Sequence, residues 1–437
     1  MSAPDASTWS VCPECLERIA ARRVLREGSL YLEKTCPRHG DFSTVIWRDA
    51  DTLAIWQDNR PAQFPENCPS GCTTCSGHGQ KPCCVLLEVT RRCDLSCSFC
   101  FASSGPAAGP DPDLRTIDGW YSRLLDAGGP FNIQLSGGEP CMRDDLETIV
   151  ALGRRRGFPF IQVNTNGLRI AGDPGYLKRL ADAGLSTVYL QFDATDDAAY
   201  ERLRGRKLFS LKQRAVENCA KQNIGVVLVA TVVPGINDHE LGSILRAGLA
   251  CSPVVRGVHF QPVSYFGRYP QQPAHENRMT LPDCMRCVVD QSGGLLELRA
   301  LSPASSEHAM CSFHGTFVYM ADGRLQALPH SPQPCACNAA EKARDFVARA
   351  WAYPQAESST PQLSLGGWDA FLERARTHLF TVSGMAFQDA WTLDLERLHR
   401  CHIFIVSPEG HMVPFCAYNL TSRAGESLYR GRTRKSP

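Results

Sequence analysis

The stretch VLLEVTRRCDLSCSFCFA, residues 85–102, decides how the rest of the chain is interpreted. It begins with the apolar run Val85–Thr90, which is typical of a buried strand, and continues into a loop with Cys93, Cys97 and Cys100. Three thiolates on one loop can bind three corners of a [4Fe–4S] cluster and leave the fourth iron without a protein ligand. Such an open iron is a substrate-binding position. The competing interpretation is a zinc site, or a chance spacing among many thiols.

Five further apolar runs follow, and amphipathic stretches separate them. The runs predict strands at Phe131–Ser136, Phe160–Asn164, Thr187–Phe192, Ile224–Val232 and Val255–Phe260. The stretches predict helices at Ile117–Ala127, Asp144–Arg156, Tyr176–Ala183 and Glu240–Ala250, with a broken helical segment that ends at Lys221. Six strands that alternate with helices imply a parallel sheet with right-handed crossovers. Both a doubly wound sheet and a partial barrel fit this pattern.

Polar or glycine motifs lie at the carboxyl ends of these strands. They are Ser136-Gly137-Gly138-Glu139-Pro140, Asn164-Thr165-Asn166-Gly167, Gln191-Phe192-Asp193, Val233-Pro234-Gly235 and His259-Phe260-Gln261-Pro262. Barrels of the α/β class build their active sites at this end. Paired glycines let the backbone approach a ligand closely, and Glu139 offers a carboxylate for an ammonium group. Each motif alone fits a strand-to-helix turn with a capping residue, but their joint occurrence after a three-cysteine loop favours a cofactor site.

With these motifs, the region from about 83 to 270 resembles the radical S-adenosylmethionine (SAM) superfamily. The resemblance implies an α/β fold with a partial (β/α)6 barrel of the TIM type, in which the open iron chelates the amino and carboxylate groups of SAM. It also implies reductive cleavage of SAM to a 5′-deoxyadenosyl radical, which abstracts hydrogen from an inert carbon. Phe99, the aromatic residue before the third cysteine, fits the superfamily pattern as well.

The resemblance assigns roles by position. Gly137, Gly138 and Glu139 would contact the amino end of the methionine part of SAM. The residues expected near the ribose and the sulfonium are Asn164, Asn166, Gln191 and Asp193. Those expected to approach the adenine are Val233 and Gly235.

Cys141 stands directly after the Gly-Gly-Glu-Pro motif, at a position where this superfamily usually has threonine. It is the one candidate for a catalytic side chain. A small polar side chain packed in place of threonine is the simpler interpretation, and a hydrogen-atom donor that faces the site is the alternative.

Residues 1–82 form a cysteine-rich region, which is predicted to need metal in order to fold. Cys12, Cys15 and Cys36, with His39, offer three sulfurs and an imidazole, so zinc and a mononuclear iron with a further cysteine are both open. Cys68, Cys72, Cys75 and Cys83 make a compact quartet that favours a second iron–sulfur cluster over structural zinc. Cys84 is surplus to that quartet and is expected to pack in the core.

Residues 271–437 form a cysteine-bearing C-terminal extension of unassigned fold. Five of its cysteines are equally consistent with a third cluster and with ordinary buried thiols, namely Cys311, Cys335, Cys337, Cys401 and Cys416.

A narrower resemblance covers both flanks. The segment from Cys68 to Ala102, the opening CPEC…CPRHG and the segment Pro414–Thr421 are similar to archaeal tetraether lipid synthases, class D radical SAM methylases and their bacterial relatives. That family implies extra iron sites, including a rubredoxin-like iron, and carbon–carbon bond formation or methylation at an inert carbon, on a lipid-like substrate. A radical SAM enzyme that modifies peptides is the alternative within the superfamily. A non-catalytic iron–sulfur or zinc protein for electron transfer or scaffolding is the alternative of another class.

The bulk composition adds weaker expectations. The net charge of +1 gives no reason to expect nucleic acid as a partner. Met1–Ser10 lacks the features of a signal peptide, and the longest apolar run, Ile224–Val233, is too short to span a membrane. We therefore expect a cytoplasmic protein that is not integral to a membrane. Its chemistry would need a low-potential electron donor of the flavodoxin or ferredoxin type.

Overall fold

The computed structural model describes residues 7–56, 69–70, 81–106, 109–270, 277–303, 306–329, 339–354 and 367–430. Several cysteines with predicted roles lie outside these ranges, namely Cys68, Cys72 and Cys75 of the predicted quartet, and Cys335 and Cys337 of the C-terminal set. None of the described helices is long and apolar enough to cross a membrane.

Six parallel strands in sequence order form the centre of the molecule. They are β5 (Cys84–Thr90), β6 (Asn132–Gly137), β7 (Ile161–Thr165), β8 (Thr187–Gln191), β9 (Gly225–Val232) and β10 (Val255–Pro262), and each pairs with the next. Runs such as Gly225–Val232 are buried on both faces, as strands of a parallel sheet require. The six predicted strands are therefore confirmed.

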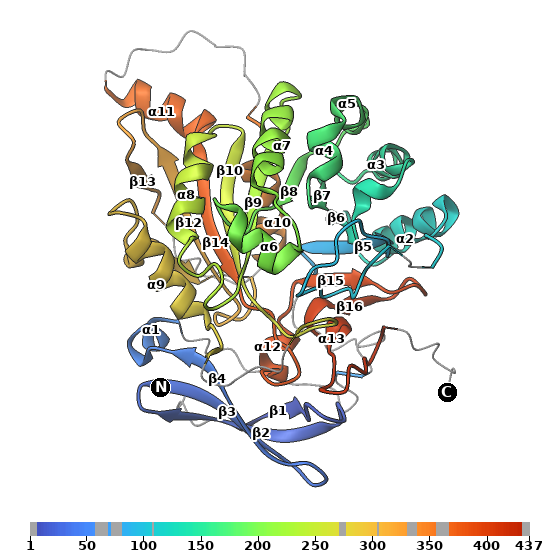
Figure 1. Ribbon diagram of the computed structural model, residues 1–437, viewed down its shortest axis with the longest axis vertical. Helices are drawn as coiled ribbons and strands as arrows, with labels where there is room; N and C mark the ends of the chain where they lie inside the picture. Colours follow the sequence, from blue (N-terminus) through green and yellow to red (C-terminus); the bar gives the residue numbers. More distant parts are fainter. Residues whose placement is uncertain are drawn as a thin grey trace.

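Amphipathic helices cover the outside of these strands (Figure 1). They are α2 (Leu114–Asp126), α3 (Leu146–Arg155), α4 (Leu168–Gly172), α5 (Pro174–Asp182), α6 (Asp197–Arg204), α7 (Phe209–Lys221) and α8 (Leu241–Ala250). In α2, the Asp113 carboxylate caps the first turn, and Ile117, Trp120, Tyr121 and Leu124 form the buried side. The predicted helical segment that ends at Lys221 is two helices, with Gly205 at positive φ between them. Strands and helices together confirm the partial (β/α)6 barrel.

Strands from the C-terminal third extend both edges of the barrel sheet. β14 (Leu379–Met385) pairs in parallel with β10, and β15 (Ile403–Val406) pairs in parallel with β5. The other strands of this part are β11 (Ser302–Pro303), β12 (Ser312–Tyr319), β13 (Leu325–Ala327) and β16 (Met412–Pro414). Its helices are α9 (Leu281–Gln291), α10 (Ala339–Trp351), α11 (Gly367–Thr377), α12 (Leu395–His399) and α13 (Phe415–Asn419). The segment expected as an extension thus contributes to the central sheet.

Helix α10 closes the amino-terminal end of the barrel. The Asn132 side-chain amide donates to the Arg344 carbonyl at 3.0 Å, and the Thr187 hydroxyl donates to the Trp351 carbonyl at 3.0 Å. Asn132 and Thr187 are the first residues of β6 and β8. The helix therefore lies at the end of the barrel opposite the cysteine loop, which follows the carboxyl end of β5.

The N-terminal region is a four-stranded antiparallel sheet, followed by α1 (Ala50–Ile55). Its strands are β1 (Ser7–Val11), β2 (Arg18–Arg26), β3 (Ser29–Cys36) and β4 (Gly40–Arg48). Figure 1 shows this sheet beside α12, and Val11 and Leu16 share an apolar cluster with the segment at 391–398. Polar contacts add to this packing: the Lys34 ammonium donates to the Ala390 carbonyl at 2.7 Å, and the Thr8 hydroxyl donates to Asp394 at 2.8 Å. Side chains of β3 alternate between buried and less buried, so one face packs inward.

Candidate functional site

A cavity of about 910 Å³ occupies the inside of the barrel. Cys93, Cys97 and Cys100 line it at the carboxyl ends of the strands, and Asn132 and Trp351 line it at the end that α10 closes. Its size is in the upper part of the range for small-molecule sites. The three thiols that the sequence singles out thus open into a space that can hold both a cofactor and a substrate.

Backbone hydrogen bonds to distant segments hold the cysteine loop in place. The Cys93 amide donates to the Gly105 carbonyl at 3.1 Å, and Cys100 and Arg268 exchange amide-to-carbonyl bonds of 2.9 and 3.0 Å. The Arg268 guanidinium also donates to the Cys97 carbonyl at 2.9 Å. Three thiols on one fixed loop, lining one cavity, fit a [4Fe–4S] cluster with three protein ligands.

The two glycines at the end of β6, Gly137 and Gly138, are required by a close approach of two backbone segments. Gly137 has a φ of +117°, and a Cβ atom there would lie 2.1 Å from the Thr90 carbonyl oxygen. A Cβ atom on Gly138 would lie 2.1 Å from the Arg92 carbonyl oxygen. The amides of Gly138 and Glu139 donate to these same two carbonyls, each at 2.8 Å. The Gly-Gly turn is therefore pressed against the segment that leads into the cysteine loop.

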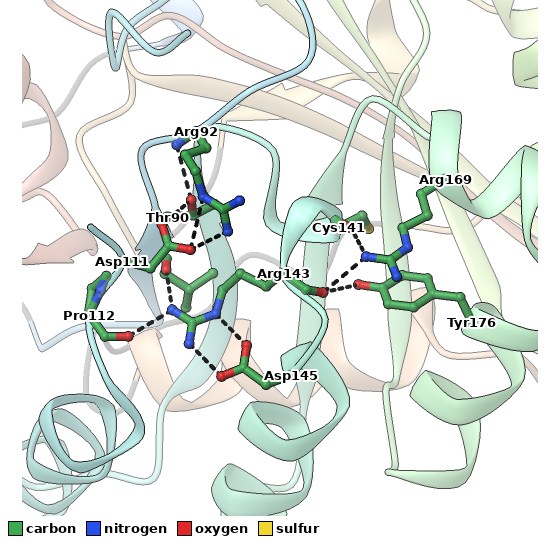
Figure 2. Close-up of polar contacts among 10 residues, drawn as sticks. Thr90, Arg92, Asp111, Pro112, Cys141, Arg143, Asp145, Arg169 and Tyr176 are labelled. Atoms are coloured by element: carbon green, nitrogen blue, oxygen red, sulfur yellow. Dashed lines mark hydrogen bonds and ion pairs between the residues drawn. The ribbon is translucent and has the colours of Figure 1, made fainter. Parts of the chain in front are cut away.

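A buried arginine, Arg143, adds hydrogen bonds near this contact, and Figure 2 shows it between Pro112 and Asp145. The Arg143 guanidinium donates to the Val89 carbonyl at 2.7 Å and to the Pro112 carbonyl at 2.8 Å. Arg92, next to the first cysteine, pairs with Asp111 at 2.5 Å. These bonds tie the end of β5 to the turn after β6 and to the loop at 111–112, so the cysteine loop starts from a fixed point.

The Glu139 carboxylate joins the ends of β6 and β7. It accepts hydrogen bonds from the Cys141 amide at 2.9 Å, from the Thr165 hydroxyl at 2.7 Å and from the Asn166 amide at 2.6 Å. Burial raises the pKa of Glu139, although these hydrogen bonds lower it. Its side chain also lines the cavity. Glu139 is therefore placed to meet a cationic group of a ligand while it holds two strand ends together.

Three of the predicted polar residues, Asn164, Asn166 and Gln191, line the same cavity. Lys212 of α7 reaches in beneath them and donates to the Asn166 carbonyl at 2.5 Å and to the Gln191 side chain at 3.2 Å. Burial lowers the pKa of Lys212 to about 8, although the charge of Asp193 raises it. The sequence did not single out Lys212, because one lysine in an amphipathic helix gives no sign of pointing inward.

Asp193, Val233 and Gly235 are not among the described residues that line the cavity. The Asp193 carboxylate instead accepts two hydrogen bonds of 2.8 Å from Arg204, which does line it. Burial lowers the pKa of Arg204, but the charges of Asp193 and of Cys97 outweigh burial and raise it. Asp193 thus acts through Arg204, which it positions beside the cysteine loop.

Cys141 lines a separate hollow of about 460 Å³, together with Asp94, Arg169 and Glu139. Its carbonyl accepts a hydrogen bond of 2.8 Å from Arg169, as Figure 2 shows. Burial raises the pKa of the Cys141 thiol well above its usual range. The structure therefore places this thiol in a different hollow from the three thiols of the cysteine loop.

A second group of metal-binding side chains lies in the N-terminal sheet. The ligand atoms of Cys12, Cys15, Cys36 and His39 all lie within 4.8 Å of one another. His39 Nδ1 is 3.5 Å from the Cys12 sulfur and 3.4 Å from the Cys36 sulfur. In a tetrahedral zinc site with bonds of about 2.3 Å, sulfurs are separated by roughly 3.8 Å. The described group holds no fourth cysteine, and three thiols with one imidazole are a typical zinc donor set.

The other described thiols that the sequence suggests as ligands of further clusters lie in two places. Cys83 is buried just before β5, and its three partners in the predicted quartet lie outside the described residues. Cys311, Cys401 and Cys416 come together, since burial and the nearby Cys416 and Cys311 all raise the pKa of Cys401. The sequence separates these three by up to 105 positions, so only the fold could show that they are neighbours.

Two family models match the chain. One is described as the radical SAM superfamily and matches residues 87–247, and the other is described as the HMPTM N-terminal zinc ribbon domain and matches residues 5–48. The zinc ribbon match agrees with the donor set at Cys12, Cys15, Cys36 and His39.

Known relatives extend the similarity over the whole chain. The 7,8-dihydro-6-hydroxymethylpterin dimethyltransferase of Methanocaldococcus jannaschii is 30% identical over 96% of this chain and 94% of that protein. The mitochondrial GTP 3′,8-cyclase of Arabidopsis thaliana is 28% identical over 41% of this chain and 46% of that protein. Among solved structures, Streptococcus suis SuiB bound to S-adenosylmethionine aligns with 48% of this chain and 46% of that chain, at 16% identity and a TM-score of 0.36.

The resemblance inferred from the three-cysteine loop is confirmed, and with it an enzyme that uses a [4Fe–4S] cluster and SAM. The zinc ribbon and the further cysteine groups support additional metal sites. The chain has the cysteine loop and the barrel, and it is similar to a known methyltransferase over nearly the full length of both proteins. It therefore belongs to the radical SAM superfamily, in the family of the M. jannaschii dimethyltransferase.

Proposed function

We propose that this protein is a radical SAM enzyme that methylates carbon atoms of a reduced pterin. The observation that carries the proposal is the similarity to the dihydropterin dimethyltransferase, which spans the zinc ribbon, the barrel and the C-terminal third. A fragment shared with many radical SAM enzymes would support only the cofactor chemistry. Similarity over 96% of the chain supports the substrate class as well.

The cavity is lined mostly by apolar groups, but the amide side chains within it offer donors and acceptors that a polar ring can use and the lipid-like substrate of the narrower resemblance cannot. Amide side chains line it on β6, β7, β8 and β10, namely Asn132, Gln134, Gln162, Asn164, Gln191 and Gln261. Several of these amides already bond to neighbouring groups, as Gln134 Nε2 does to Asn164 Oδ1 at 2.5 Å, but Asn132 Oδ1 is a buried acceptor without a partner among the described residues. Packing a hydrocarbon chain against that acceptor would leave it unpaired, which costs about 1–3 kcal/mol. Aromatic side chains such as Tyr189 and Trp351 line the cavity too and offer flat surfaces for a ring.

The chain's own residues bind, orient and shield the reactants. When bound, the cluster and SAM supply a 5′-deoxyadenosyl radical that can remove a hydrogen atom from an unactivated carbon. Arg204 and Lys212 bring positive charge beside the cysteine loop, where anionic thiolates and a carboxylate would be held. His259 stays neutral in the lumen, because burial lowers its pKa to about 4. A low-potential electron donor of the flavodoxin or ferredoxin type would complete the system.

Expression of the protein in a living host, followed by analysis for methylated pterins, tests this proposal. The chain is expressed in bacteria that make 6-hydroxymethyl-7,8-dihydropterin, and cell extracts are analysed by mass spectrometry for pterins that carry one or two added methyl groups. Each methyl group replaces one carbon-bound hydrogen and comes from a one-carbon donor of the cell, such as SAM. We expect methylated pterins with the parent chain and none with the Cys93, Cys97, Cys100→Ala variant.

A parent chain that carries its clusters and yields no methylated pterin would contradict the proposal. Lipid extracts of the same cells are analysed in parallel. Methyl groups or new carbon–carbon bonds found there in place of methylated pterins would return the assignment to a lipid substrate.

A further inference from the structure

We propose that Glu307 and Asn132, at the deep end of the barrel cavity, recognise the aminopyrimidinone edge of the substrate and turn its other ring toward the cysteine loop. This inference rests on the proposed function, because it takes the substrate to be a reduced pterin. It adds a recognition site and a binding direction that the sequence motifs do not contain.

Glu307 is a buried carboxylate inside the cavity, and its side chain is 3% exposed. Its Oε2 atom accepts a hydrogen bond of 2.7 Å from the Ser306 hydroxyl and lies 3.2 Å from Nδ1 of His402, while its Oε1 atom accepts from the Ser312 hydroxyl. Burial raises the pKa of Glu307, but the charge of His402 and the serine hydroxyls outweigh burial and lower it. The lumen therefore contains a buried carboxylate whose two oxygens are held in place by these contacts.

The His402 side of this carboxylate lies at the amino end of β5, whereas Ser312 pairs with Met385 at the carboxyl end of β14. The His402 carbonyl accepts a hydrogen bond of 2.9 Å from the Cys83 amide, and the Cys83 carbonyl accepts one of 3.1 Å from the Asn132 amide. His402, Cys83 and Asn132 thus sit at the amino ends of β15, β5 and β6. The cysteine loop follows the carboxyl end of β5, a strand of seven residues and therefore about 20 Å long.

Asn132 supplies an independent sign that a ligand belongs here. Its side chain lines the cavity and is only 1% exposed. The amide nitrogen donates to the Arg344 carbonyl at 3.0 Å, but the Oδ1 atom has no hydrogen-bond partner among the described residues. A buried acceptor without a partner is costly, and a bound ligand that offers an N–H group would remove that cost.

The edge of a pterin matches these groups. Its 2-amino group and the adjacent ring N–H point the same way, so they can donate to the two oxygens of one carboxylate, as a guanidinium does. The second hydrogen of the amino group remains for an acceptor such as Asn132 Oδ1. In 7,8-dihydro-6-hydroxymethylpterin, every carbon-bound hydrogen lies on the opposite ring or its hydroxymethyl group. Anchoring the amino edge at Glu307 therefore turns those hydrogens toward the SAM end of the cavity.

The test compares two stable probes on the reconstituted, unreduced protein with SAM bound. One is 6-hydroxymethylpterin, and the other is 6-hydroxymethyllumazine, which has an oxygen in place of the 2-amino group. Binding is followed by quenching of probe fluorescence. We expect the parent chain to bind the pterin about 30-fold more tightly than the lumazine, because the lumazine presents an oxygen to the Glu307 carboxylate.

The variant Glu307→Gln is expected to lose most of this preference, because its neutral amide can both donate and accept. Glu409→Gln, which alters an exposed glutamate, is the matched control and should keep the preference of the parent chain. If Glu307→Gln fails to fold, the variant Asn132→Leu tests the recognition site in its place. It should weaken pterin binding about tenfold and leave lumazine binding unchanged.

The outcomes separate the two proposals. An unchanged pterin preference in Glu307→Gln, or in Asn132→Leu where that variant replaces it, would overturn the recognition site and leave pterin binding itself in support of the proposed function. A parent chain that holds its clusters and SAM but binds neither probe would contradict the proposed function and the recognition site together.

Discussion

Replacing Cys93, Cys97 and Cys100 together by alanine is expected to abolish the formation of 5′-deoxyadenosine. These are the three thiols of the loop, and all three line the cavity where SAM would meet an open iron. The measurement is anaerobic: the protein is reconstituted with iron and sulfide, reduced with dithionite, mixed with SAM, and the nucleosides are separated by chromatography.

Cys251→Ala is the control for this experiment, because Cys251 is exposed and far from the grouped thiols in the sequence. It should form 5′-deoxyadenosine at the parent rate. The triple variant should keep its bound zinc and any iron held elsewhere, which metal analysis shows. Equal 5′-deoxyadenosine from the triple variant and the parent would rule out the assignment of the cluster to this loop.

The double variant Cys12, Cys36→Ser is expected to lose its zinc and, with it, the fold of the N-terminal sheet. Structural zinc sites contribute about 10–16 kcal/mol of apparent binding free energy at neutral pH, which exceeds the stability of most small domains. The apolar cluster around this site is small, with Cys12, Ile19 and Cys36 at its centre. Metal content and limited proteolysis, with the cut sites mapped by mass spectrometry, check the expectation.

Cleavage should then fall within residues 7–48, while the barrel stays resistant and keeps its cluster absorbance. Cys287→Ser, which changes a half-buried thiol on α9, serves as the control and should behave like the parent. Iron in place of zinc at this site of the parent protein would contradict the assignment of the metal.

The sequence predicted the inner barrel because its signals are local. Each strand from β5 to β10 is a short stretch rich in apolar residues, which alternate with polar ones in strands such as β6, and a glycine or polar motif follows at the strand end. The additional strands gave no such signal. β15 has four residues, and its partner β5 lies more than 300 positions earlier in the chain, so only long-range packing could show that they pair.

The residues of the candidate site divide in the same way, into those with a local sequence signal and those without one. The cysteine loop and the Gly137-Gly138 turn could be found from residue types and spacing alone. Arg204 could not, because its pairing with Asp193 depends on how α6 folds back onto β8. The polar side chains of the lumen do have a sequence signal. In β6, Asn132, Gln134 and Ser136 alternate with apolar residues, which is the pattern of a strand with one polar, inward-facing side.

The transfer of deuterium from substrate to 5′-deoxyadenosine tests most directly whether the cavity brings SAM and a reduced pterin together. The substrate is 6-hydroxymethyl-7,8-dihydropterin with deuterium on its carbon-bound positions, given to the reconstituted and reduced enzyme with unlabelled SAM. We expect 5′-deoxyadenosine that carries deuterium, formed faster than without the pterin. If the pterin leaves the amount of 5′-deoxyadenosine unchanged and the 5′-deoxyadenosine carries no deuterium, the result would contradict the proposed function. The radical would then form without a pterin carbon beside it.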